Sequence, residues 1–111
     1  MTNQLLSKEI CPSTSFIHLI TGRWICLILR ILILKGPFRF NELKYQVIGI
    51  STKVLTEKLR ELEKVNLVSR HYESCIPPKV TYTITDRGLE LRTMFMMMDD
   101  TSQRWRKDNI I

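Results

Sequence analysis

The polar residues at positions 51–60 have the types and the spacing that suit recognition of a nucleic acid. A helix is indicated here by leucines at i, i+4 and i+7, which define its core face: Leu55, Leu59 and Leu62. The opposite face then presents Lys53, Thr56 and Arg60. Ser51 and Thr52 begin the helix, where short hydroxyl groups can reach base edges or phosphates. The alternative is an ordinary solvated face of mixed charge.

Basic side chains on either side of this helix are suited to contacts with a phosphate backbone. They are Arg39, Lys44, Arg70 and Lys79. We expect Arg39 and Asn41, at the start of the preceding helix, and Lys79, in a following hairpin, to contact phosphates. The residues predicted for a DNA interface are therefore Arg39, Asn41, Ser51, Thr52, Lys53, Thr56, Arg60 and Lys79.

The three cysteines, Cys11, Cys26 and Cys75, are an odd number without paired spacing, which argues against a secreted disulfide framework. Cys11 precedes a predicted helix start and lies near Lys8, a setting that favours the reactive thiolate. The alternative is that Cys11 is only a small apolar residue. Cys26 falls in an apolar helix and is expected to be inert, whereas an exposed Cys75 could resolve an oxidised Cys11.

Metal binding and catalysis have little support in the sequence. The cysteines form no Cys-x-x-Cys pair, and the two histidines, His18 and His71, are far apart. The sequence contains neither a glycine-rich phosphate loop nor a nucleophile elbow. We therefore expect no metal, no cofactor and no enzymatic activity.

Length and charge indicate one basic domain. The chain has 111 residues and a net charge of +6, which fits a single domain over 1–111 with a polyanionic partner. The first twelve residues lack the pattern of a signal peptide, and the longest apolar run, 24–34, is too short to span a bilayer. These features predict a soluble cytoplasmic protein without a membrane partner.

The elements that must position these residues are short helices followed by a hairpin. Helices are predicted over 13–21, 23–34, 40–47 and 51–65, with the second packed on every side and ended by Gly36 at positive φ. Gly49 breaks the chain between the third and fourth helices, which makes a helix-turn-helix. Strands over 68–74 and 79–85, joined by a tip with two prolines, form a wing. The predicted fold is mainly α with a small β-hairpin, a winged helix-turn-helix with extra terminal helices.

A last helix over about 86–107 carries large apolar residues at near-heptad spacing: Leu91, Met94, Met98 and Trp105. One small core cannot absorb so many large residues at the chain end, so we interpret the stripe as a seam with a second copy. The alternative is packing against the first helix of the same subunit.

Ordered motifs across residues 11–90 resemble the HxlR-type transcriptional regulators, which are related to the MarR regulators. Among them are Thr21-Gly22-Arg23-Trp24, Gly36-Pro37-Phe38-Arg39-Phe40-Asn41-Glu42-Leu43, Gly49-Ile50-Ser51, Lys53-Val54-Leu55-Thr56, Pro77-Pro78-Lys79-Val80 and Thr85-Asp86-Arg87-Gly88. The chain departs from the family pattern at Asn66, where glycine is usual, and at Arg23, where lysine is commoner. Asparagine tolerates the left-handed conformation, so the turn at Asn66 is expected to survive.

The resemblance implies a homodimeric winged helix that binds a pseudo-palindromic operator in double-stranded DNA. It also implies that a cysteine at the start of the first helix, here Cys11, is a candidate sensor of oxidants or electrophiles. It does not identify the operator, the regulated genes or a small-molecule effector. A different function for the same fold is a protein–protein interaction module that does not bind DNA.

Overall fold

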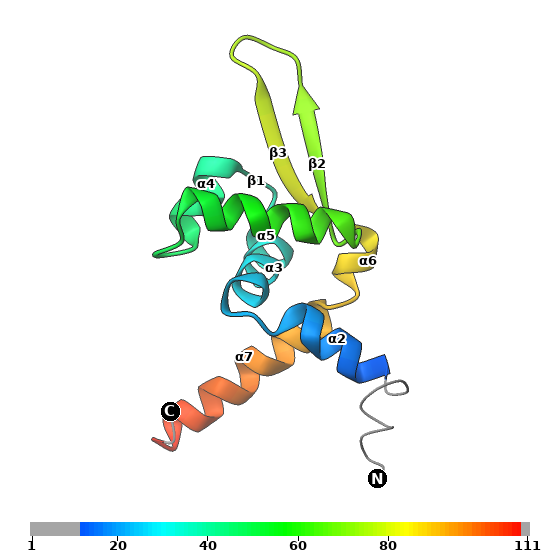
Figure 1. Ribbon diagram of the computed structural model, residues 1–111. Helices are drawn as coiled ribbons and strands as arrows, with labels where there is room; N and C mark the ends of the chain where they lie inside the picture. Colours follow the sequence, from blue (N-terminus) through cyan, green and yellow to red (C-terminus); the bar gives the residue numbers. More distant parts are fainter. Residues whose placement is uncertain (1–11, 110–111) are drawn as a thin grey trace.

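The computed structural model describes residues 12–109, and their elements form a winged helix with a long C-terminal helix (Figure 1). In chain order the elements are α2 (Pro12–Ile20), α3 (Arg23–Lys35), β1 (Phe38–Arg39), α4 (Phe40–Gln46), α5 (Thr52–Lys64), β2 (Val68–Glu73), β3 (Lys79–Ile84), α6 (Asp86–Leu89) and α7 (Arg92–Lys107). The mainly helical fold class predicted from the sequence is confirmed.

The central helix α3 supplies one wall of the core through Ile25, Ile28, Leu29, Leu32 and Ile33, all of which are buried. The prediction that α3 is packed on every side is wrong within the single chain. Its other face leaves Leu27 41% exposed.

Gly36 ends α3 for a reason other than the predicted one. Its φ is −68°, so the left-handed conformation is not what requires glycine at this position. A Cβ atom on Gly36 would lie 2.7 Å from the carbonyl oxygen of Leu32, which is closer than a side chain can approach. Glycine is therefore needed here because the backbone of the last helical turn passes so near.

The helix-turn-helix consists of α4, a turn through Gly49 and α5. Gly49 has φ of +89°, a conformation that glycine adopts without strain. Ser51 caps α5, since its Oγ accepts a hydrogen bond from the backbone N–H of Val54 at 3.1 Å. The leucines at 55, 59 and 62 are buried as predicted, which fixes the opposite face of α5 toward solvent.

The wing is part of a three-stranded antiparallel sheet with the order β1-β3-β2. The hairpin of β2 and β3 is as predicted, whereas β1 was missed: Phe38 pairs with Tyr82 and Arg39 with Thr81. Asn66 has φ of +62°, so the left-handed turn expected between α5 and β2 is present. The hairpin projects away from the helices at one end of the molecule (Figure 1).

The single helix expected over 86–107 is two helices, α6 and α7, separated by Glu90 and Leu91. Thr85 begins α6, because its Oγ1 accepts from the backbone N–H of Gly88 and donates to the carbonyl oxygen of Asn66. Phe95 of α7 is fully buried in the core, so the start of α7 belongs to the domain. The rest of α7 extends away at the end opposite the wing (Figure 1).

Two further features concern membranes and metals. In the part of the chain that the structure describes, no single helix is long and apolar enough to cross a membrane; α2 and α3 together would meet that criterion by length and composition, but they bend by 83° at the break between them. Across residues 12–109, no group of three or more His, Cys, Asp and Glu side chains is arranged to hold a metal ion.

Candidate nucleic-acid interface

The start of α5 presents hydroxyl and basic groups to solvent. Ser51, Thr52 and Lys53 are all exposed, and the capping hydrogen bond uses a lone pair of the Ser51 hydroxyl while its proton stays available for donation. Thr56 is half-buried and its Oγ1 donates to the carbonyl oxygen of Thr52 at 2.8 Å. Thr56 can therefore accept a hydrogen bond, or offer its methyl group to a base, more readily than it can donate.

A second group of predicted residues lies close together where α4 begins and strand β3 of the wing starts. Arg39, Asn41 and Lys79 line one open hollow of about 430 Å³, together with Phe40, Glu42, Pro78 and Val80. The pairing of β1 with β3 causes this meeting, because it fixes the chain before α4 to the strand that Lys79 begins. The Glu42 carboxylate accepts from the backbone N–H of Arg39 at 2.8 Å and so stabilises the start of α4.

A second hollow, of about 370 Å³, lies between α5 and the wing. Thr56, Arg60 and Glu63 line it from α5, and Arg70 lines it from β2, above the buried Leu59 and Tyr82. The sequence marked Arg70 only as a flanking charge. Its place beside Arg60 depends on the register of the sheet, in which Arg70 pairs with Tyr82.

None of the cations predicted for this surface forms an ion pair with another described residue. Among residues 12–109 the ion pairs are Arg30 with Asp99, Lys58 with Glu61 and Arg104 with Asp100, and none includes a residue predicted for the DNA interface. Arg39, Lys53 and Arg60 are exposed. Their charge is therefore available to a polyanion.

Of the residues predicted for a dimer seam, Met94, Met98 and Trp105 lie on α7 and Leu91 immediately precedes it. Helix α7 extends at the end of the molecule away from the wing (Figure 1). Leu91 and Met94 are half-buried against the core, whereas Met98 and Trp105 are exposed. An open apolar groove of about 420 Å³ runs along this face of α7 and is lined by Met94, Met97, Met98, Thr101, Ser102 and Trp105. The alternative, packing against the first helix of the same subunit, has support at Leu91, which lines a small hollow together with Phe16 and Leu19 of α2.

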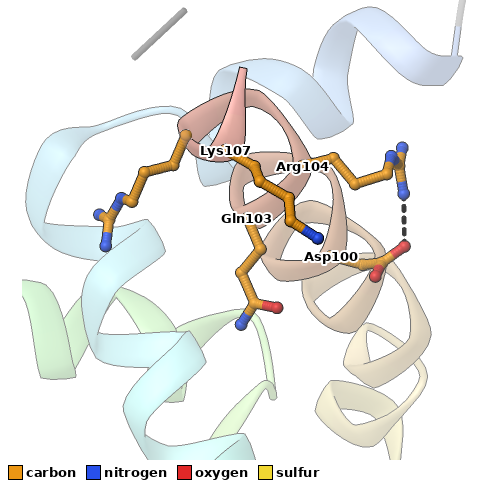
Figure 2. A pocket seen from close by; sticks show the side chains of 5 residues that line it. Asp100, Gln103, Arg104 and Lys107 are labelled. Atoms are coloured by element: carbon orange, nitrogen blue, oxygen red, sulfur yellow. Dashed lines mark hydrogen bonds and ion pairs between the residues drawn. The ribbon is translucent and has the colours of Figure 1, made fainter. Parts of the chain in front are cut away.

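A different side of α7 is polar (Figure 2). Asp100, Gln103, Arg104 and Lys107 line an open hollow there, and Arg104 is paired with Asp100 one turn earlier. The apolar groove and this polar hollow share no residue, so the exposed part of α7 is amphipathic.

The two cysteines that the structure describes differ in burial. Cys11 lies outside the described residues. Cys26 is half-buried in α3, and this burial raises the pKa of its thiol, which suits the inert role expected for it. Cys75 is exposed at the wing tip, as predicted, with its Sγ 3.1 Å from the carbonyl oxygen of Pro77.

A helix-turn-helix, a β wing and basic groups on both that form no ion pairs among the described residues define a winged-helix DNA-binding protein. The family model described as HxlR-like helix-turn-helix matches residues 19–110. The chain belongs to this family. It is a transcriptional regulator of HxlR and MarR type and not an enzyme.

Individual relatives agree with this assignment. The chain is 36% identical over 97 residues to the HTH-type transcriptional regulator sll1512 of Synechocystis sp., covering 87% of this chain and 71% of that protein. It is 37% identical over 94 residues to the HTH-type transcriptional regulator YodB of Bacillus subtilis, covering 84% of this chain and 83% of YodB.

Solved structures are also similar. The reduced form of YodB from B. subtilis has a TM-score of 0.72 at 38% identity, with 86% of this chain and 90% of that chain covered. The redox regulator HypR in its reduced form has a TM-score of 0.79 at 30% identity, with 86% and 94% covered.

Proposed function

We propose that the protein binds a pseudo-palindromic operator as a homodimer, with α5 in the major groove. The observation that carries this proposal is the face of α5 from Ser51 to Arg60, on which Lys53 and Arg60 are exposed and form no ion pair with another described residue. The buried leucines on the other side of α5 hold this face outward. Base contacts fall to Lys53 and Thr56, and Ser51, Thr52 and Arg60 contact the adjoining backbone.

Further contacts to the DNA backbone come from the hollow at the start of α4. Arg39, Asn41 and Lys79 meet there, and two cations with an amide donor are suited to a DNA phosphate. Phosphate contacts of this kind fix the register of the reading helix on the duplex without adding sequence preference.

Dimer formation through α7 is supported by its apolar groove. Met98 and Trp105 expose apolar surface on a helix that leaves the domain core, and surface of this kind on a small soluble domain marks an interaction site. A two-fold dimer would double the same contact and carry two reading helices to two half-sites.

The experiment that tests this function is a binding-site selection with the purified protein, followed by affinity measurements over a range of salt concentrations. We expect an inverted-repeat site whose affinity falls steeply with added salt, because each neutralised phosphate releases counterions. The alternative protein-interaction module would select no site, and its apolar docking would be nearly independent of salt.

We also propose that oxidants change operator binding through Cys11. The support is the place of Cys11 before a helix start, the resemblance to regulators that sense through a cysteine there, and the similarity to YodB and HypR, which have been solved in reduced and in diamide-treated or oxidised forms. Cys75, exposed at the wing tip, is the candidate resolving thiol.

A further inference from the structure

The hollow between α5 and β2 has a lining that suits one phosphodiester group. Its two arginines come from the two elements that form it, Arg60 from α5 and Arg70 from β2. Leu59 and Tyr82, which are buried, line the same hollow, so both arginines stand over a packed floor. The volume, about 370 Å³, leaves room for a group larger than a few water molecules.

The charge of the hollow matches a singly charged oxyanion. Two arginines and Glu63 give 2 − 1 = +1, and a backbone phosphodiester carries one negative charge. Neither arginine takes part in an ion pair with another described residue, so both guanidinium groups can turn toward a ligand. Guanidinium groups present paired N–H donors that fit phosphate oxygens.

The other polar groups of the hollow are poorly suited to replace the arginines. The hydroxyl proton of Thr56 is used by the carbonyl oxygen of Thr52, and Glu63 accepts hydrogen bonds only. The donors that an oxyanion requires must therefore come from Arg60 and Arg70.

Arg70 is also held in a well-defined part of the wing. It pairs with Tyr82 of β3, two residues after the buried Val68, so its backbone lies at the base of the hairpin and not at the tip. A donor on a fixed backbone loses less conformational freedom when it binds than one on a free loop.

We propose that Arg60 and Arg70 hold one backbone phosphodiester of the DNA between α5 and the wing. Helix α5 and strand β2 then contact the same DNA strand. Arg70 fixes how deeply α5 enters the major groove and does not contact a base. This inference rests on the proposed function, because the ligand is the backbone of the duplex that α5 reads.

The test is the salt dependence of DNA binding by Arg70→Gln, measured on the selected operator and on an unrelated duplex. Loss of one phosphate contact in each subunit should reduce the magnitude of the slope of log affinity against log salt by about 0.9 per subunit, or about 1.8 for the bound dimer, on both duplexes and leave their affinity ratio unchanged. The matched control is Arg87→Gln, which removes the same charge from the exposed surface of α6 and should keep the wild-type slope.

Two further variants examine the geometry. Arg70→Lys should recover the slope, because it restores the charge, but bind more weakly than the wild type, because an ammonium group lacks the paired donors. The double variant Arg60→Gln with Arg70→Gln should lose less affinity than the product of the fold-losses of the two single variants. The reason is that either single change already weakens the contact to the same phosphate.

The outcomes separate this inference from the proposed function. A wild-type slope in Arg70→Gln, or a lower affinity ratio between operator and unrelated duplex, would overturn the phosphate clamp and leave operator binding in place. Failure of the wild-type protein to bind any duplex would overturn both. Arg70 is exposed, so its truncation leaves no cavity, and circular dichroism of each variant checks the fold.

Discussion

Arg30 and Asp99, which lie 69 residues apart in the chain, form a two-pronged ion pair between α3 and α7. The Arg30 Nε donates to one carboxylate oxygen at 3.0 Å and the Nη2 donates to the other at 2.8 Å. Hydrogen bonding from Arg30 lowers the pKa of Asp99, and the same bond raises the pKa of Arg30. The helix proposed for dimer formation is thus tied by a directional contact to the central helix of the DNA-binding domain.

Replacement of Asp99 by asparagine should lower the free energy of unfolding by roughly 0.5–1 kcal/mol near neutral pH. The pair is bidentate, but both side chains are more than a third exposed, so solvent screening keeps the effect small. The measurement is chemical denaturation of both proteins. Asp100→Asn, which breaks the exposed pair with Arg104 in the same helix, is the matched control and should cost less.

The same pair predicts a pH dependence with a definite sign. Because the pKa of Asp99 is lower in the folded state, its contribution is fully present above the ordinary carboxyl value of about 4 and is lost as the pH falls through the lowered value. The stability difference between wild type and Asp99→Asn should therefore be constant from about pH 7 to about pH 5 and shrink as the pH falls from about 4 to about 2. A difference that stayed constant over this range would mean that the pair does not act through charge.

Lys53→Ala and Arg60→Ala should each weaken operator binding while the protein stays folded. A lost base contact costs roughly 1–3 kcal/mol and relaxes the preference at that base, whereas a lost phosphate contact weakens all sequences alike. Fluorescence anisotropy with the operator and with point variants of it distinguishes the two. Arg92→Ala, an exposed arginine at the start of α7, is the control. Wild-type affinity in both test variants would mean that α5 is not the reading helix.

Much of the fold could be predicted because local patterns determine it. The leucine spacing of α5, the Ser51 cap and the turn at Gly49 are encoded within a few residues, and the structure contains all of them. The two-residue strand β1 has no such signal, because only pairing with a strand about forty residues later makes it a strand. The break at 90–91 was also missed, since no proline separates α6 from α7.

The candidate site was likewise predictable only in part. The outward face of α5 follows from helical periodicity, so its exposed residues could be predicted one by one. That Arg39 and Asn41 share a hollow with Lys79, or that Arg60 shares one with Arg70, depends on the strand register and could not be read from the sequence.

Introduction of glutamate at Met98 and Trp105 together should produce monomers that bind the operator weakly. Charged groups in the apolar groove oppose burial against a second copy, and a monomer cannot link two half-sites. Sedimentation velocity measures the assembly. Met96→Glu is the control, because Met96 is exposed on α7 to the same degree as Met98, 51%, but does not line the groove. An intact dimer in the double variant would move the interface elsewhere, with the exposed Leu27 face of α3 as the next candidate.

Diamide should change the operator affinity of the wild-type protein but not that of Cys11→Ser. Diamide takes two electrons from a pair of thiols, which join as a disulfide while their protons pass to the reduced reagent, so the response requires a reactive thiolate and a partner thiol. A modest coupling of about 1–3 kcal/mol between this cysteine and the DNA face is sufficient.

The other two cysteines provide the controls for this response. Cys26→Ser should respond like the wild type, because burial raises the pKa of Cys26 and leaves little thiolate to react. Cys75→Ser should lose the response only if Cys75 is the resolving thiol, and non-reducing electrophoresis then shows whether the Cys11–Cys75 bond joins two chains or closes one. The measurement is operator affinity with and without diamide for each variant. A full diamide response in Cys11→Ser would remove the sensor proposal and leave operator binding untouched.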